Sequence, residues 1–167
     1  MRLPFVLLMT AVLLAGCGSG VDRAEVGRLQ DEVDSAARIT AITVSEALIA
    51  TLPPGTSLGT GRTVECTAGS GGVSYSVETA VTHAPMDAVA ALRQVAKEIE
   101  REGYTAVYDA KDEVVRSDVG DVRAEIRAEG AGETPTAHEI VVTTGCIEVG
   151  RDLAADLAKE PGRDVKR

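Results

Sequence analysis

The chain has 167 residues, which is long enough to bury the core of one domain. Its formal net charge is −9 at pH 7, and this acidity argues against binding to nucleic acid or directly to anionic lipid headgroups. The chain has three tyrosines, one phenylalanine and no tryptophan. Because sugar-binding and drug-sized pockets usually have aromatic walls, the composition disfavours both kinds of site.

A short apolar run opens the chain. Arg2 precedes residues 5–15, which are almost entirely apolar and too few to span a bilayer. The run ends in Leu14-Ala15-Gly16-Cys17, with two small residues directly before the cysteine. This combination resembles a bacterial lipobox and predicts cleavage after residue 16 and acylation of Cys17. We therefore expect a lipoprotein anchored at the outer face of the cytoplasmic membrane; the alternative is an ordinary secretory leader with an incidental cysteine.

These features divide the chain into four parts. The expected parts are a signal peptide (1–16), the lipidated cysteine with a flexible spacer (17–21), a single α+β domain (22–149) and a polar carboxy-terminal tail (150–167). In the tail we expect at most one or two helical turns, followed by disorder.

Two cysteines remain after the anchor, Cys66 and Cys146. An even pair in an oxidising compartment predicts a disulfide, and closing a loop of about 80 residues stabilises a fold by roughly 4–5 kcal/mol at most. The alternative, a catalytic or metal-binding thiol, lacks a CxxC spacing or a nearby histidine. We expect Cys66 on the first strand and Cys146 on the last, so that the bond joins the two ends of the sheet.

Two amphipathic helices are predicted. Asp22 and Glu25 have the spacing of a capping box, and apolar residues then recur at three- and four-residue steps as far as Leu48. Threonine and serine at residues 40–45 weaken the second half of this helix, so a break there is one alternative. The second helix is expected to begin at Pro85 and to end at a glycine cap before Tyr104.

The strands are predicted from alternation of apolar and polar residues. It is clearest over residues 73–81 and 122–128, and five to six strands are expected in all. Alternation implies one buried and one solvated face. The sequence therefore predicts an α+β fold, an antiparallel sheet of about five to six strands packed on one face by two helices.

No residue set predicts catalysis, a metal site or a cofactor. His83 and His138 are the only histidines and are expected on the surface, because zinc needs three or four converging ligands. The carboxylates near residues 109–121 lie in predicted turns and do not follow the calcium-loop pattern. No Gly-x-Ser-x-Gly elbow is present.

The layout as a whole resembles a family of small actinobacterial lipoproteins. The matching pieces are the lipobox at residues 14–17, Pro53-Pro54-Gly55-Thr56, Cys66, the helix leading to Gly103-Tyr104, and Gly145-Cys146. Members of the family often have a tryptophan near the second helix, where this chain has Tyr104. The resemblance implies an envelope location and this fold, and it implies no catalytic residue.

We expect a non-catalytic binding module whose partner is another protein of the cell envelope. One alternative is a carrier or sensor of a small ligand held between the first helix and the sheet. Another is a hydrolase with an atypical site, which requires His83 or His138 to converge with a serine or with carboxylates.

Overall fold

A computed structural model describes residues 21–119, 122–129 and 134–167. The described helices are α1 (Arg23–Ala47), α2 (Ala88–Arg101) and α3 (Arg151–Leu157). The described strands are β1 (Ser57–Glu65), β2 (Gly72–Thr82), β3 (Thr105–Asp109), β4 (Val114–Val119), β5 (Val122–Ala128), β6 (Ala137–Thr143), β7 (Ile147–Glu148) and β8 (Arg163–Lys166).

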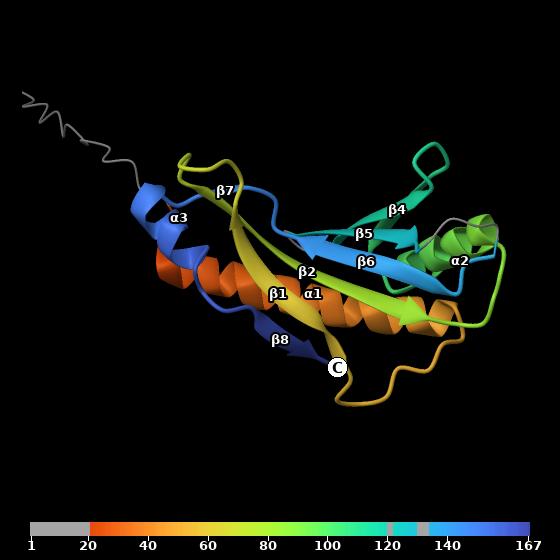
Figure 1. The fold of residues 1–167 in the computed structure, drawn as a ribbon. Helices are drawn as coiled ribbons and strands as arrows, with labels where there is room; N and C mark the ends of the chain where they lie inside the picture. The colour runs from red at the N-terminus through yellow and green to blue at the C-terminus, as the bar shows by residue number, and fades with distance from the viewer. Residues whose placement is uncertain (1–20, 120–121, 130–133) are drawn as a thin grey trace, which may run out of the picture.

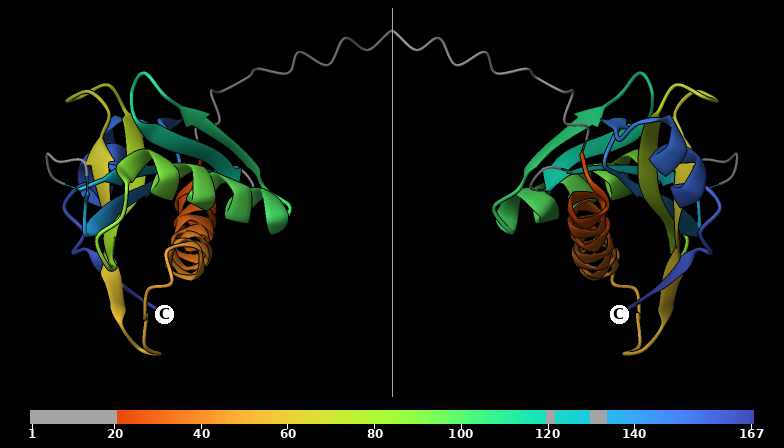
Figure 2. Two further views of the ribbon diagram at one scale, coloured as in Figure 1. Left: turned by 90° about the vertical axis from the view of Figure 1, so that its right-hand side faces the viewer. Right: turned by 90° about the vertical axis from the view of Figure 1, so that its left-hand side faces the viewer.

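The strands form one antiparallel sheet in the order β3-β4-β5-β6-β2-β1-β8, and β7 also pairs with β2. The prediction of an α+β fold is confirmed, although the sheet has eight described strands rather than five to six. The sheet curves around α1, and α2 crosses the same side (Figures 1 and 2). None of the three described helices covers the opposite side of the sheet, which is called here the open face.

Helix α1 is continuous through the segment where a break was considered. Its 25 residues give a length of about 37 Å. Small side chains form its inner face, and Ala37, Ala41 and Val44 are fully buried, which lets the helix lie close to the sheet. Ser45 donates a hydrogen bond to the carbonyl of Ile42 (2.7 Å), so this buried hydroxyl is satisfied inside the helix.

The amino-terminal caps differ from the predictions in detail. Asp22 accepts a hydrogen bond from the Glu25 amide (2.9 Å), as expected, but the Glu25 side chain binds Arg28 instead of closing a capping box. The expectation that α2 begins at Pro85 was wrong. The helix begins at Ala88, because Asp87 accepts from the amide of Ala90 (2.7 Å) and is its N-cap.

The carboxy-terminal tail is ordered, so the prediction of disorder after a short helix was wrong. Helix α3 has seven residues, within the predicted one or two turns, and β8 then pairs with β1. Val165 is buried in the main core. Arg163 forms ion pairs with Asp31 (2.7 Å) and Asp34 (3.3 Å) on α1, so the end of the chain is tied to the first helix.

Candidate functional site

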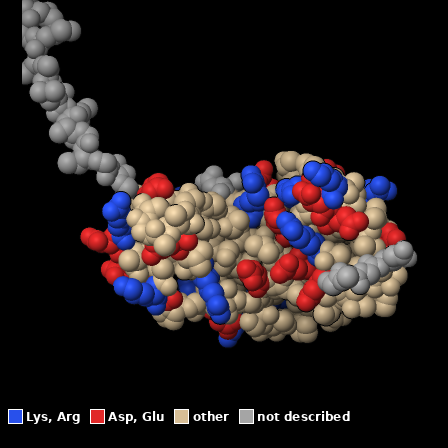
Figure 3. All heavy atoms as spheres, turned by 45° about the horizontal axis from the view of Figure 1, so that its top comes forward, with Lys and Arg blue, Asp and Glu red and all other residues tan. Residues whose placement is uncertain are grey.

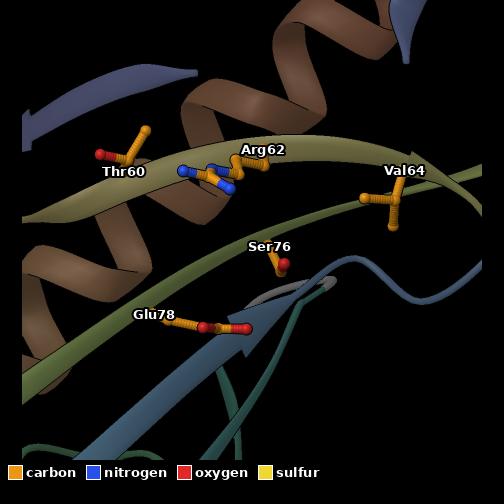
Figure 4. Close-up of a pocket in the computed structure, with 5 residues that line it drawn as sticks. All are labelled: Thr60, Arg62, Val64, Ser76 and Glu78. Atoms are coloured by element: carbon orange, nitrogen blue, oxygen red, sulfur yellow. The ribbon is translucent and has the colours of Figure 1, made fainter. Parts of the chain in front are cut away.

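The open face has two neighbouring hollows. The first is about 430 Å³ in volume and lies over β1 and β2. Figure 4 shows the side chains around it, which are those of Thr60, Arg62, Val64, Ser76 and Glu78. Four of these five side chains are polar or charged, so the hollow suits a hydrated, polar ligand.

The second hollow is shallower, about 260 Å³, and continues along β2 toward β6. It shares Glu78 with the first hollow, and the carboxylates of Glu129 and Glu139 also line it. Strand β2 supplies Ser76, Glu78 and Ala80 to this face, because alternate residues of a strand point to the same side. The two hollows therefore lie end to end along one strand.

An ion-pair network covers the neighbouring part of the open face, over β4 and β5. Arg116 binds Asp109 (2.8 Å), Asp112 (2.9 Å) and Glu125 (3.1 Å), and Arg127 binds Glu125 from the other side (2.8 Å). In Figure 3, acidic and basic side chains lie beside one another over the top of the molecule. These pairs are open to solvent, so each contributes little stability.

The network alters the ionisation of its carboxylates. The pKa of Asp109 is lowered by hydrogen bonds, first from the Lys111 amide and then from Arg116. Partial burial alone would raise the pKa of Glu125, but hydrogen bonds from Arg127 and Arg116 outweigh it and lower that pKa. Both groups are thus held in the charged form at neutral pH.

The two histidines converge, and the prediction that both lie on the surface was wrong for His138. Its side chain is fully buried, and its Nδ1 lies 2.8 Å from Nε2 of His83. Nδ1 of His83 lies 2.6 Å from the carbonyl oxygen of Ala84. The pairing register of β2 and β6 brings His138 opposite Val81, two residues before His83.

The protonation pattern of this pair follows from its partners. A carbonyl oxygen only accepts, so Nδ1 of neutral His83 carries the proton and its Nε2 accepts. Nδ1 of His138 must then donate to His83, which leaves its Nε2 as a buried acceptor without a partner among the described residues. Burial, and secondarily the nearby His83, lower the pKa of His138 to about 4.

Among the described residues, neither histidine ring forms a hydrogen bond to a serine or a carboxylate. Within the same described ranges, no three metal-binding side chains of the His, Cys, Asp or Glu type gather at one point.

The two predicted disulfide partners are joined in the structure. Cys66 and Cys146 form a disulfide with their Cα atoms 6.0 Å apart. The expectation that this bond joins the two ends of the sheet was wrong. Cys66 follows β1 and Cys146 precedes β7, and both of these strands pair with β2. The bond therefore passes over the first residue of β2, Gly72, where a Cβ atom would lie 2.8 Å from Sγ of Cys146.

The predicted acylation motif, Leu14-Ala15-Gly16-Cys17, lies outside the described residues. The described chain begins at Val21, whose amide donates to the carbonyl of Glu148 on β7 (3.1 Å). In the part of the chain that the structure describes, no helix combines the length and the apolar character needed to cross a membrane.

Comparison with known proteins assigns no relative: no protein-family model, curated protein or solved structure matches the chain.

Proposed function

We propose that this protein is a lipid-anchored, extracytoplasmic binding module of the cell envelope, without catalytic activity of its own. The observation that carries the proposal is the sequence Leu14-Ala15-Gly16-Cys17 after an apolar run of signal-peptide length. An exported location fits the Cys66–Cys146 disulfide, because such bonds persist in oxidising compartments.

The geometry of the fold supports an anchor at one end of the domain. Val21 is four positions after Cys17 in the sequence, and an extended chain reaches at most about 14 Å over four positions. The Val21 amide donates to Glu148 of β7, the strand that directly follows Cys146, and the Val21 side chain packs in the same cluster as Ala154 and Leu157 of α3. Acyl chains on Cys17 would hold this end of the domain at the bilayer, and α1 extends about 37 Å from it.

The open face supports a role in binding. It lies on the side of the sheet that faces away from α1 and extends along the strands, so it remains accessible while one end of the domain is at the membrane. It has the two hollows and exposed charges of both signs, which suit a polar partner. The region between α1 and the sheet is occupied by the buried side chains of the main core. We therefore assign binding to the open face rather than to a cavity beneath the helix.

The anchor is tested by exchanging cysteines and fractionating cells. The wild-type protein is expected in the membrane fraction, released by detergent and not by salt, and the Cys17→Ala variant is expected to leave that fraction. The control is the double variant Cys66→Ala/Cys146→Ala, which removes the disulfide and keeps the anchor. Retention of Cys17→Ala at the membrane would contradict the proposal.

The binding role is tested by site-specific photo-crosslinking in intact cells. A photoreactive residue at Glu78, on the open face, is expected to give a discrete adduct with an envelope component. The same residue at Lys97, which is exposed on α2, is the control and is expected to give none. Equal labelling from both positions would contradict a specific surface.

A further inference from the structure

The charges of the open face fall into two groups that differ in pairing. Over β4 and β5 the arginines are neutralised, since Arg116 has three carboxylate partners and Arg127 has one. Over β1, β2 and β6 the opposite holds. Among the described residues, Arg62, Glu78 and Glu139 take part in no ion pair, although all three point to the same face.

This lack of pairing is not explained by distance along the sheet. Arg62 faces Ser76 across β1 and β2, so Glu78 is its diagonal neighbour, within reach of a long side chain. In Figure 4 the guanidinium of Arg62 and the carboxylate of Glu78 nevertheless lie apart across the first hollow. Arg127 similarly lies opposite Glu139 across β5 and β6, but its ion pair is with Glu125.

The unpaired charges of opposite sign lie at opposite ends of the two hollows. Arg62 lies on β1 in the first hollow, Glu78 is shared by both hollows, and Glu129 and Glu139 line the second. From Ser76 to Ala80 the strand advances four residues, or about 13 Å. One end of this stretch thus has an unpaired cation and the other has several carboxylates.

We propose that these hollows bind a short peptide segment with a free C-terminal carboxylate and an ammonium group at its other end. The proposal deepens the binding function given above and rests on it. Arg62 receives the carboxylate, because its planar guanidinium can donate two parallel hydrogen bonds. The hydroxyls of Thr60 and Ser76 line the same hollow and offer further donors.

The ammonium group lies at the acidic end. Glu78 and Glu139 accept its hydrogen bonds, and their combined charge favours a ligand with more than one positive group there. A tripeptide in extended form is about 10 Å long, and a lysine side chain at its first residue extends its reach beyond the roughly 13 Å between the levels of Arg62 and Glu139 along the strand. A free amino acid is too short to reach both ends and binds more weakly.

The probe is the tripeptide Lys-Ala-Ala, which has two ammonium groups at its first residue and a free carboxylate at its last. Binding to the full-length protein in a neutral detergent is followed by saturation-transfer difference NMR. We expect saturable binding at millimolar peptide. The C-terminal amide of the same peptide, which lacks the carboxylate, is expected to bind at least fivefold more weakly.

Protein variants assign the two ends. Arg62→Met, which keeps the aliphatic stem, is expected to lower the affinity for the peptide with a free carboxylate at least fivefold and to change the affinity for the peptide amide little. Glu78→Gln is expected to lower the affinity for both peptides about threefold. The matched controls are Arg123→Met and Asp118→Asn, an exposed pair on the same face, and they are expected to change binding less than twofold.

Three results would overturn the proposal: no binding at 10 mM peptide, equal affinity for the acid and the amide, or full affinity in Arg62→Met. The comparison of acid and amide uses wild-type protein, so it does not depend on the folding of any variant. Such a failure leaves the membrane anchor intact, because the fractionation of Cys17→Ala is read separately.

Discussion

His138 shows how one buried side chain can make a fold sensitive to acid. It is the second residue of β6, its imidazole is buried and neutral, and among the described residues that ring forms a hydrogen bond only to His83. Protonating it would place a charge in a region without an acceptor for the second N–H among the described residues. The native state therefore disfavours the proton, and the pKa of His138 falls to about 4.

This shift predicts a loss of stability between pH 6.5 and 4. In that window the unfolded chain binds a proton at His138 and the native state does not, so the free energy of unfolding falls as the pH falls. The loss is at most about 3 kcal/mol and is complete near pH 4. Urea unfolding at pH 7, 5.5 and 4 measures it. His138→Leu is expected to flatten this dependence, and an unchanged slope would show that another group is responsible.

Tyr75 is the second residue whose surroundings are specific. Its hydroxyl donates to Asp34 on α1 (2.7 Å), and burial, followed by this hydrogen bond, raises its pKa above the ordinary value. Gly61 on the neighbouring strand leaves room for the tyrosine, because a Cβ atom at Gly61 would overlap the phenol ring and hydroxyl. The contact between α1 and the sheet thus depends on the absence of a side chain at Gly61.

Two glycine-to-alanine substitutions test this contact with opposite expected signs. Gly61→Ala is expected to destabilise the protein by about 2 kcal/mol or more, because the tyrosine must move and lose its hydrogen bond. Gly27→Ala on α1 meets open space and is expected to stabilise the protein by about 0.5–1 kcal/mol. Thermal unfolding of both variants is the measurement, and a Gly61→Ala protein as stable as wild type would contradict the account.

Among the elements, α1 ends in an unusual way. The amides of Ile49 and Ala50 bond back to Glu46 (3.2 Å) and Ser45 (2.7 Å), which is the Schellman pattern. That pattern needs a left-handed residue, and Ile49 fills it with φ 52° and a side chain that is 90% exposed. A β-branched residue is disfavoured in this conformation, and little burial compensates for it.

Replacing this residue by glycine is therefore expected to stabilise the protein. Ile49→Gly removes the backbone strain and is expected to raise the free energy of unfolding by about 0.5–1 kcal/mol, measured by urea unfolding. Thr51→Gly, at an exposed position with ordinary φ, is the control and is expected to lower stability slightly. If Ile49→Gly instead lowers the free energy of unfolding, the isoleucine side chain contributes more stability than its backbone strain costs.

How well each element could be predicted depends on its local pattern. Strands β2 and β5 alternate over their whole length, so their alternation predicted both their existence and their faces. Strand β8 has only one buried apolar residue, Val165, between charged neighbours, and this is too short a pattern to predict a strand. Its order comes from partners distant in sequence, β1 and the carboxylates Asp31 and Asp34 of α1, which local reasoning cannot identify.

At the scale of the molecule, the disulfide links the segments that flank the central strand β2. Strand β2 lies between β1 and β6, and the bond between Cys66 and Cys146 joins the segments on its two sides. The cysteines are separated by 80 positions in sequence, so the bond closes a loop of about half of the 167-residue chain in the unfolded state. The pairing was predictable from the number of cysteines, but its place at the start of β2 required the register.

Removing the bond is expected to be costly. The double variant Cys66→Ser/Cys146→Ser is expected to lose about 2–5 kcal/mol of unfolding free energy, seen as a lower urea midpoint. Wild-type protein with reductant provides the matched comparison and is expected to unfold near the variant. Coincident unfolding curves for oxidised and reduced wild type would show that the bond contributes no stability.

The candidate site could be predicted less well than the fold. Its residues lie on β1, β2, β6 and the end of β5, and no motif links them in sequence. Whether an arginine such as Arg62 or Arg116 is paired depends on the register of neighbouring strands. The composition gives the net charge of the chain and does not divide its charged residues into paired and unpaired groups.

The central claim is an acylated Cys17 on a domain closed by a disulfide, and intact mass spectrometry of the membrane-extracted protein tests it most directly. The account predicts loss of residues 1–16, a diacyl or triacyl increment on Cys17, and alkylation of Cys66 and Cys146 only after reduction. An unmodified amino terminus, or two thiols that react without reduction, would contradict it.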